Sequence, residues 1–165
     1  MPPTSDIPGF IASYRSANDE GRICFAGNGR DAEEFLDRNA AFREQVLDVV
    51  LQDISLAPLE LVRDLFRAET QCSREAWGIV DGVGLLAENM LRRGGVPFLN
   101  DYLEGKFQSF DAHIGSAFTA DLPLATTMLN EVRQRLQHSP AAPQAPLWQA
   151  GEELFLGWIA NLKES

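Results

Sequence analysis

The sequence predicts an all-α protein, folded as a single irregular bundle of about seven helices. Apolar residues recur along most of the chain at the i, i+3, i+4, i+7 spacing of one helix face. Typical capping and stop residues flank most of these segments. A length of 165 residues suits one domain. A short α-solenoid of helical hairpins is the alternative, although Pro58, Pro97 and Pro123 follow no fixed period.

The first helix is expected after Ser5 and Asp6, either of which can act as its N-cap. Residues 21–30 contain a brief apolar run that ends at glycines, which predicts a short strand or a loop. Asp31 then has the character of an N-cap, because acidic residues follow it in what would be a first helical turn. The helix that it opens is expected to reach residue 51, with Asn39 as a break or a second cap within it.

Four more helices are expected in the middle of the chain. Pro58 preorganises the first turn of one of them. Ser73 is the candidate N-cap of the next, and two arginines followed by two glycines, residues 92–95, predict its end. Pro97 begins the third of these helices and Asp121 caps the fourth.

The chain is expected to form one domain with three parts. Residues 1–138 make the helical core. Residues 139–146 hold three prolines in eight residues, which predicts an extended connector. Residues 147–165 make a strongly amphipathic helix that docks on the core or, in a homodimer, on a second copy of the chain.

The chain carries 14 basic and 24 acidic residues, for a net charge of −10. Basic residues do not cluster beyond Arg92 and Arg93, so binding to nucleic acid or to an anionic membrane is disfavoured. A protein partner, in particular a basic one, fits this charge better. Neither a secretory signal nor an apolar run near the roughly 20 residues of a membrane span is visible, and we expect a cytoplasmic protein.

Residues typical of catalytic and metal sites are sparse. His113 and His138 are the two histidines, and neither has a ligand partner at the spacing of a helical metal site. Cys24 and Cys72 lie far apart without a CxxC motif, which indicates two free thiols. We therefore expect no metal and no cofactor, and enzymatic activity is less expected than its absence. An enzyme that uses carboxylates and His113 is the least favoured alternative.

Residues 27–32 and 82–87 both match the G-x-G-x-x-A pattern of dinucleotide-binding turns. Neither match lies in a β-α-β unit, and the first precedes acidic residues that would repel a phosphate. We interpret the first as a tight turn that leads into a helix. The second lies inside the predicted helix after Ser73, where Gly78 and Gly82 indicate close approach of a neighbouring helix or of a ligand.

Aromatic residues and their polar neighbours are the candidate binding residues. They fall after Pro97 and in the C-terminal helix, and they are Tyr102, Phe107, Phe110, Asp111, His113, Trp148 and Trp158. We expect a noncatalytic interaction module, an adaptor or an acidic, immunity-like inhibitor, that binds a protein partner. A binder of a small apolar ligand in a pocket between helices is the alternative.

Overall fold

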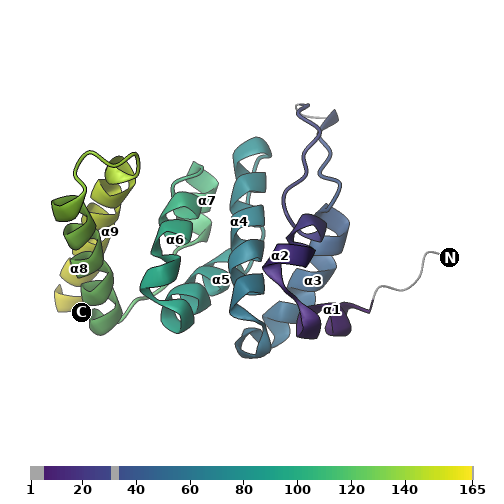
Figure 1. Cartoon of the computed structure of the whole chain (residues 1–165), viewed down its shortest axis with the longest axis horizontal. Helices are drawn as coiled ribbons and strands as arrows, with labels where there is room; N and C mark the ends of the chain where they lie inside the picture. Colours follow the sequence, from purple (N-terminus) through teal and green to yellow (C-terminus); the bar gives the residue numbers. More distant parts are fainter. Residues whose placement is uncertain (1–5, 31–33, 165) are drawn as a thin grey trace.

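The computed structural model describes residues 6–30 and 34–164 and confirms the all-α prediction, with nine α-helices and no named strand in these residues. The elements succeed one another along the long axis of the molecule (Figure 1). The helices are α1 (Ile7–Ser13), α2 (Ser16–Asp19), α3 (Ala40–Gln52), α4 (Leu59–Glu75), α5 (Val83–Asn89), α6 (Leu99–Lys106), α7 (Phe110–Gly115), α8 (Leu122–His138) and α9 (Ala145–Glu164). Short 3-10 segments (Glu20–Arg22, Ile54–Leu56, Val96–Phe98) and a π-helical turn (Met90–Gly94) join several of them. No helix in the described ranges is long and apolar enough to cross a membrane.

Side-chain caps fix the starts of three helices. The Asp6 carboxylate accepts a hydrogen bond from the Gly9 amide at 2.9 Å in α1, as the sequence predicts. Asp121 accepts the Leu124 amide at 2.9 Å and begins α8, which confirms a second predicted cap. Ser109, which the sequence analysis did not single out, accepts the Ala112 amide at 3.0 Å. This serine makes α7 a separate short helix after α6.

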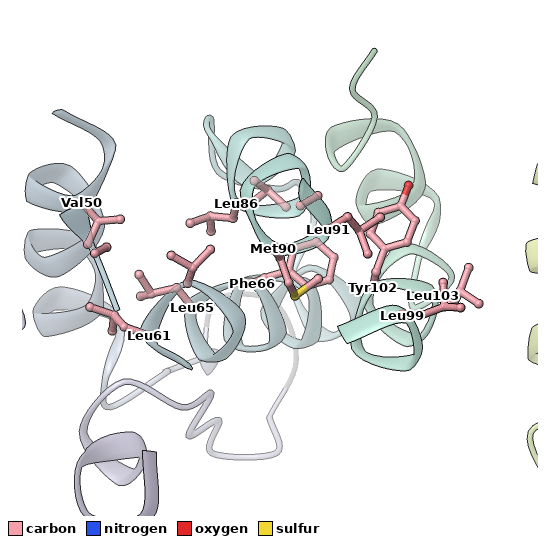
Figure 2. Close-up of a cluster of buried hydrophobic side chains, with 14 of the residues drawn as sticks. Val50, Leu61, Leu65, Phe66, Leu86, Met90, Leu91, Leu99, Tyr102 and Leu103 are labelled. Carbon is pink, nitrogen blue, oxygen red and sulfur yellow. The ribbon is translucent and has the colours of Figure 1, made fainter. Parts of the chain in front are cut away.

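Helix α4 lies at the centre of the core and contacts α2, α5, α6 and α7. Each large apolar side chain in this core contributes about 1.5 to 3 kcal/mol by leaving water. Figure 2 shows the central cluster, which combines side chains from α3 to α6 and the π-helical turn and includes Val50, Leu61, Leu65, Phe66, Leu86, Met90, Leu91, Leu99, Tyr102 and Leu103.

Helices α8 and α9 form a closely packed pair at the C-terminal end of the molecule (Figure 1). Phe155 of α9 is fully buried, and Trp148 is 7% exposed. The Trp148 indole donates a hydrogen bond of 3.0 Å to Oδ1 of Asn100, at the start of α6. The C-terminal helix therefore packs on its own chain, against α8 and α6.

The proline-rich segment forms a tight turn, so the expectation of an extended connector over residues 139–146 is wrong. The Ser139 carbonyl accepts the Ala142 amide at 3.1 Å, and the Ala142 carbonyl accepts the Ala145 amide at 2.9 Å. Helix α9 already begins at Ala145, with Pro146 in its first turn. A proline at that position loses no hydrogen bond, because the first amides of a helix have no partner within it.

A hairpin loop, described over residues 24–30 and 34–39, lies where the sequence predicts a short strand or a loop and then the first part of a helix. Gly27 and Asp37 form an isolated antiparallel bridge between its two arms. The expected N-cap, Asp31, lies outside the described residues. Helix α3 begins at Ala40, well after that position.

Polar side chains of the loop account for this late helix start. The Asp37 carboxylate accepts the amides of Ala26 at 3.0 Å and Asn39 at 3.1 Å. The Asn28 side chain accepts the Leu36 amide at 3.1 Å. Such short-range bonds from Asp and Asn side chains compete with the helical hydrogen bonds of the backbone. In this segment the side-chain bonds form, and the helix begins only at Ala40.

A second loop, residues 76–82, interrupts the helix that the sequence analysis began at Ser73. Helix α4 runs through Ser73 and ends at Glu75. Gly78 and Gly82 have φ angles of 95° and 92°, a left-handed conformation that residues with a side chain rarely adopt. The interpretation of these glycines as helix-interior residues is therefore wrong, since they build the turn between α4 and α5.

Candidate functional site

Trp77 lies in the 76–82 loop with its whole side chain in solvent, at a relative exposure of 103%. Large aromatic side chains are usually mostly buried, because burial stabilises the fold by about 1.5 to 3 kcal/mol each. Tryptophan is also the residue type most enriched among those that dominate binding energy at protein interfaces. An exposed tryptophan at a fixed position therefore marks a candidate binding site.

Contacts with α7 fix the loop that carries Trp77. The Gly78 amide donates a hydrogen bond of 2.8 Å to Oδ2 of Asp111. The hydroxyls of Ser73 in α4 and Ser109 at the start of α7 share a hydrogen bond of 2.6 Å. The loop, the end of α4 and α7 therefore hold one another in place, and Trp77 is presented from a preorganised backbone.

Helix α7 turns one face to this loop and an adjoining face to solvent. Asp111 and Gly115 lie one turn apart on the inner face, where a Cβ on Gly115 would come within 2.5 Å of the Ile79 side chain. Phe110 and Ile114, also one turn apart, are 79% and 58% exposed. We call this region the Trp77 surface and define it by the apolar residues Trp77, Val80, Phe110 and Ile114 and the bordering acidic residues Glu75, Asp81 and Asp111.

Trp77 stands between two open hollows of the surface. Charged residues dominate the first, of about 280 Å³, whose lining includes Arg74, Glu75 and Asp111. Apolar groups dominate the second, of about 300 Å³, whose lining includes Cys72, Ile79 and Val80. Ser73, Ala76 and Trp77 line both hollows, so the two hollows meet at Trp77.

The border of this surface is acidic. Glu75, Asp81 and Asp111 lie here with Arg74, which pairs with Glu75 at 2.8 Å; Arg30, which lines a neighbouring hollow with Glu75, is paired with Glu34 at 2.9 Å. A positively charged group approaching Trp77 therefore meets a favourable field, whereas an anionic group is repelled.

Four of the seven predicted site residues lie at or beside the Trp77 surface. Phe110 and Asp111 belong to it. Phe107, at the end of α6, and His113 of α7 lie next to it, with their ring centroids 5.6 Å apart. Three of these four residues lie on α7, and Phe107 precedes it.

The other three predicted residues, all aromatic, lie away from this surface. Tyr102 is completely buried, and its hydroxyl has no hydrogen-bond partner in the described part of the chain. Trp148 of α9 is buried, and its indole is hydrogen-bonded to Asn100. Trp158 is half-buried, with its ring centroid 5.2 Å from that of Phe118, and lines a hollow of about 310 Å³ with it. These residues mainly hold α9 on the rest of the molecule.

His113 faces a lysine instead of a carboxylate. The buried Lys106 donates a hydrogen bond of 2.8 Å from Nζ to the His113 carbonyl, and burial lowers the pKa of Lys106 to about 8. Burial and the Lys106 charge also lower the pKa of His113, which keeps its imidazole neutral at pH 7. The neighbouring Asp111 bonds to Gly78 instead. Within residues 6–30 and 34–164, no three His, Cys, Asp or Glu side chains come together as metal ligands.

A buried ion-pair network ties the hairpin loop to α4. Arg43 of α3 is 2% exposed and pairs with Asp37 at 2.7 Å and with Glu69 at 2.6 Å. Its guanidinium also donates to the Ile23 carbonyl at 3.3 Å. Next to it, burial raises the pKa of the Cys72 thiol, which therefore stays protonated at neutral pH. This network is structural, since all its charged groups are occupied by one another.

Trp77 itself was missed by the sequence analysis, because the apolar periodicity placed it inside a continuous helix. A signal against that helix was present in Gly78 and Gly82. Each glycine costs roughly 1 kcal/mol in a helix interior relative to alanine, so two of them favour a break. A loop at this point would have left Trp77 without a helix face to bury it.

No family model, curated protein or solved structure matches this chain.

Proposed function

We propose that this chain is a noncatalytic protein-interaction module that binds a protein partner through the Trp77 surface. Adaptor proteins and acidic inhibitors of other proteins are the classes that such a module fits. The observation that carries the proposal is the fully exposed Trp77 on a loop that α7 holds in place.

The shape and chemistry of the region support a protein as the ligand. Small molecules usually bind in concave pockets that bury most of their surface. Here the central group projects from the surface, with hollows on either side and with exposed Phe110 and Ile114 beyond it. Interfaces between proteins have this arrangement, in which a few aromatic anchors supply most of the binding energy within a polar rim.

Site-specific photo-cross-linking in cells of the source organism tests this proposal. The photoreactive amino acid p-benzoylphenylalanine replaces Trp77 in one variant and Phe110 in another. Its matched control replaces Leu56, which is 80% exposed but precedes α4 and so lies at the opposite end of that helix. We expect the same protein to be cross-linked from positions 77 and 110 and not from position 56.

The cross-linked protein is then purified and its affinity measured. Trp77→Ala is expected to weaken binding by at least about tenfold, or about 1.4 kcal/mol, and to leave the circular dichroism spectrum unchanged. Absence of a cross-link from positions 77 and 110, or the same cross-link from position 56, would contradict the proposal.

A small apolar ligand is the second candidate, because an apolar hollow opens between α1 and α3. It measures about 340 Å³, and its lining includes Ile11, Val49 and Leu56. A fluorescent apolar dye would be expected to bind there, and Leu56→Asp to abolish its signal. If the dye signal survives Leu56→Asp, this hollow is not the ligand site.

A further inference from the structure

We infer that the partner of the Trp77 surface presents a basic amphipathic segment, with a cationic and an apolar side chain on opposite sides of the Trp77 indole. This inference rests on the proposed function and specifies the chemistry of the partner. It follows from the different linings of the two hollows that flank Trp77.

The first hollow suits a cation. Glu75 binds Arg74 through Oε1, and Asp111 binds the Gly78 amide through Oδ2. The second oxygen of each carboxylate has no hydrogen-bond partner among the residues that the structure describes. A Lys or Arg side chain entering here would meet these oxygens and the face of the indole, which attracts cations through its ring electrons.

The second hollow suits an apolar side chain. Ile79 and Val80 contribute aliphatic surface, and Cys72 remains an uncharged thiol because burial raises its pKa. Glu69 also lines the hollow, but its carboxylate pairs with the buried Arg43 at 2.6 Å. Glu69 is only 5% exposed and its carboxylate is held by Arg43, which it shares with Asp37, so the hollow offers a guest mainly apolar contact.

A single helical segment can fill both hollows. Side chains three or four residues apart on a helix lie about 5 to 6 Å from each other at Cβ, close enough to straddle one aromatic ring. Phe110 and Ile114 would then cover the remainder of the apolar stripe. An amphipathic helix against an apolar surface is a common mode of peptide recognition.

The negative charge of the chain favours some binding partners of the Trp77 surface over others. A second copy would bring another net charge of −10 to a border that already holds Glu75, Asp81 and Asp111. Nucleic acids and anionic membranes carry the same sign of charge and are disfavoured for the same reason. A basic protein segment is the occupant that gains from this field.

The test compares two synthetic helical peptides of about 18 residues, a length at which a designed sequence can be helical. Both carry the same apolar stripe; one flanks it with lysines and the other with glutamates. Binding is followed through the indole N–H signal of Trp77 in nitrogen-15 NMR spectra, assigned with Trp77→Phe. We expect the lysine peptide to shift this signal and to bind at least about tenfold tighter, with a preference that weakens as salt is added.

Two sets of variants locate the effect. Glu75→Gln combined with Asp111→Asn keeps an oxygen to accept the Gly78 amide and is expected to remove the preference for lysine. Asp48→Asn combined with Glu153→Gln makes the same change in net charge at exposed positions of α3 and α9. This control pair is expected to preserve the preference for the lysine peptide. Glu75→Gln alone serves if the double variant unfolds.

Each other outcome overturns the inference. A basic amphipathic partner is rejected by equal binding of the two peptides, by tighter binding of the glutamate peptide, or by no shift of the Trp77 signal. The proposed function is still decided separately, by the cross-linking result. Equal loss of preference in both variant pairs shows attraction by net charge alone. If the wild-type protein is dimeric by sedimentation and the Trp77→Ala variant is monomeric, the Trp77 surface binds a second copy of the chain.

Discussion

Arg43 shows how one residue joins parts of the chain that are far apart in sequence. It sits in α3 and reaches both the hairpin loop, through Asp37, and α4, through Glu69. A buried ion pair is weak as a source of net stability, because its charges must leave water. Removing one partner is different, since it leaves the remaining charges buried without compensation.

Arg43→Met is accordingly expected to destabilise the fold by about 3 to 5 kcal/mol, because Asp37 and Glu69 lose their counterion. Urea unfolding followed by circular dichroism measures this change. Arg30→Ala is the control: it breaks an ion pair whose side chains are 66% and 69% exposed, and should cost less than about 1 kcal/mol. Similar losses in the two variants would show that the network does not act as a buried charge cluster.

Lys106 makes the stability of the fold depend on pH in a defined direction. Burial lowers its pKa from 10.5 to about 8 in the folded protein. Above pH 8 the folded chain has released this proton while the unfolded chain still holds it, so stability rises with pH up to 10.5. Below pH 8 both states hold the proton and this group contributes no slope.

Between about pH 7 and 9.5 we expect Lys106 to add about 2 kcal/mol to the free energy of unfolding. Urea unfolding of the wild type and of Lys106→Met across this range isolates the effect. Cys72 acts in the opposite direction, since its raised pKa favours the folded state at low pH, but it is common to both proteins and cancels. Parallel pH profiles for the two proteins would refute the assignment to Lys106.

At the scale of elements, the turn between α4 and α5 depends on backbone conformations that suit glycine. A Cβ added to Gly78 would meet nothing within 4 Å, so the positive φ alone restricts replacement. At Gly82 a Cβ would also come within 2.5 Å of Leu51. Replacement of Gly78 therefore tests backbone strain alone, and replacement of Gly82 tests backbone strain together with steric crowding.

Gly78→Ala is expected to destabilise the fold by about 1 kcal/mol and Gly82→Ala by about 2 kcal/mol or more. Gly157 provides the matched control, because it lies in α9 with ordinary helical φ and nothing near its Cβ position. Gly157→Ala should stabilise by roughly 0.5 to 1 kcal/mol. Thermal unfolding measures all three, and a gain in stability from Gly82→Ala would contradict the conformation of the turn.

Periodicity and caps were sufficient to predict most of the helices, because these signals are local. Asp6, Pro58 and Asp121 act at the helix starts where the sequence analysis placed them. The failures occurred where local patterns compete. The hairpin loop is fixed by side-chain hydrogen bonds of Asn28 and Asp37, and periodicity carries no information on such bonds.

The candidate site was predictable only in part. Phe110 was selected as an aromatic residue and Asp111 as its polar neighbour, and both lie on the Trp77 surface. Tyr102 and Trp148 were also selected as aromatic residues and are buried. Whether an aromatic side chain faces the core or the solvent depends on which helices pack together, and the spacing within one helix does not reveal this.

At the scale of the whole molecule, packing joins mainly elements that are neighbours in sequence, such as α4 with α5 and α8 with α9. Helix α9 completes this arrangement by covering α6 and α8 with its buried face. The C-terminal helix thus has a place on its own chain, and the net charge of −10 opposes association between copies.

We therefore expect the purified chain to be a monomer of 18.3 kDa. Sedimentation equilibrium at low and at high salt tests this, because salt would weaken repulsion between copies. A dimer under both conditions would show that α9, or another surface, joins two copies. In that event a photo-cross-linker placed on α9 would identify the contact.

The bond between Gly78 and Asp111 spans 33 residues of sequence. A nascent chain that has left the ribosome only as far as α5 already contains Trp77, but not the helix that fixes its loop. Under the proposed function, the chain would become able to bind its partner only once α7 has emerged and docked. A fragment that ends before Ser109 should then retain the tryptophan and lose the binding.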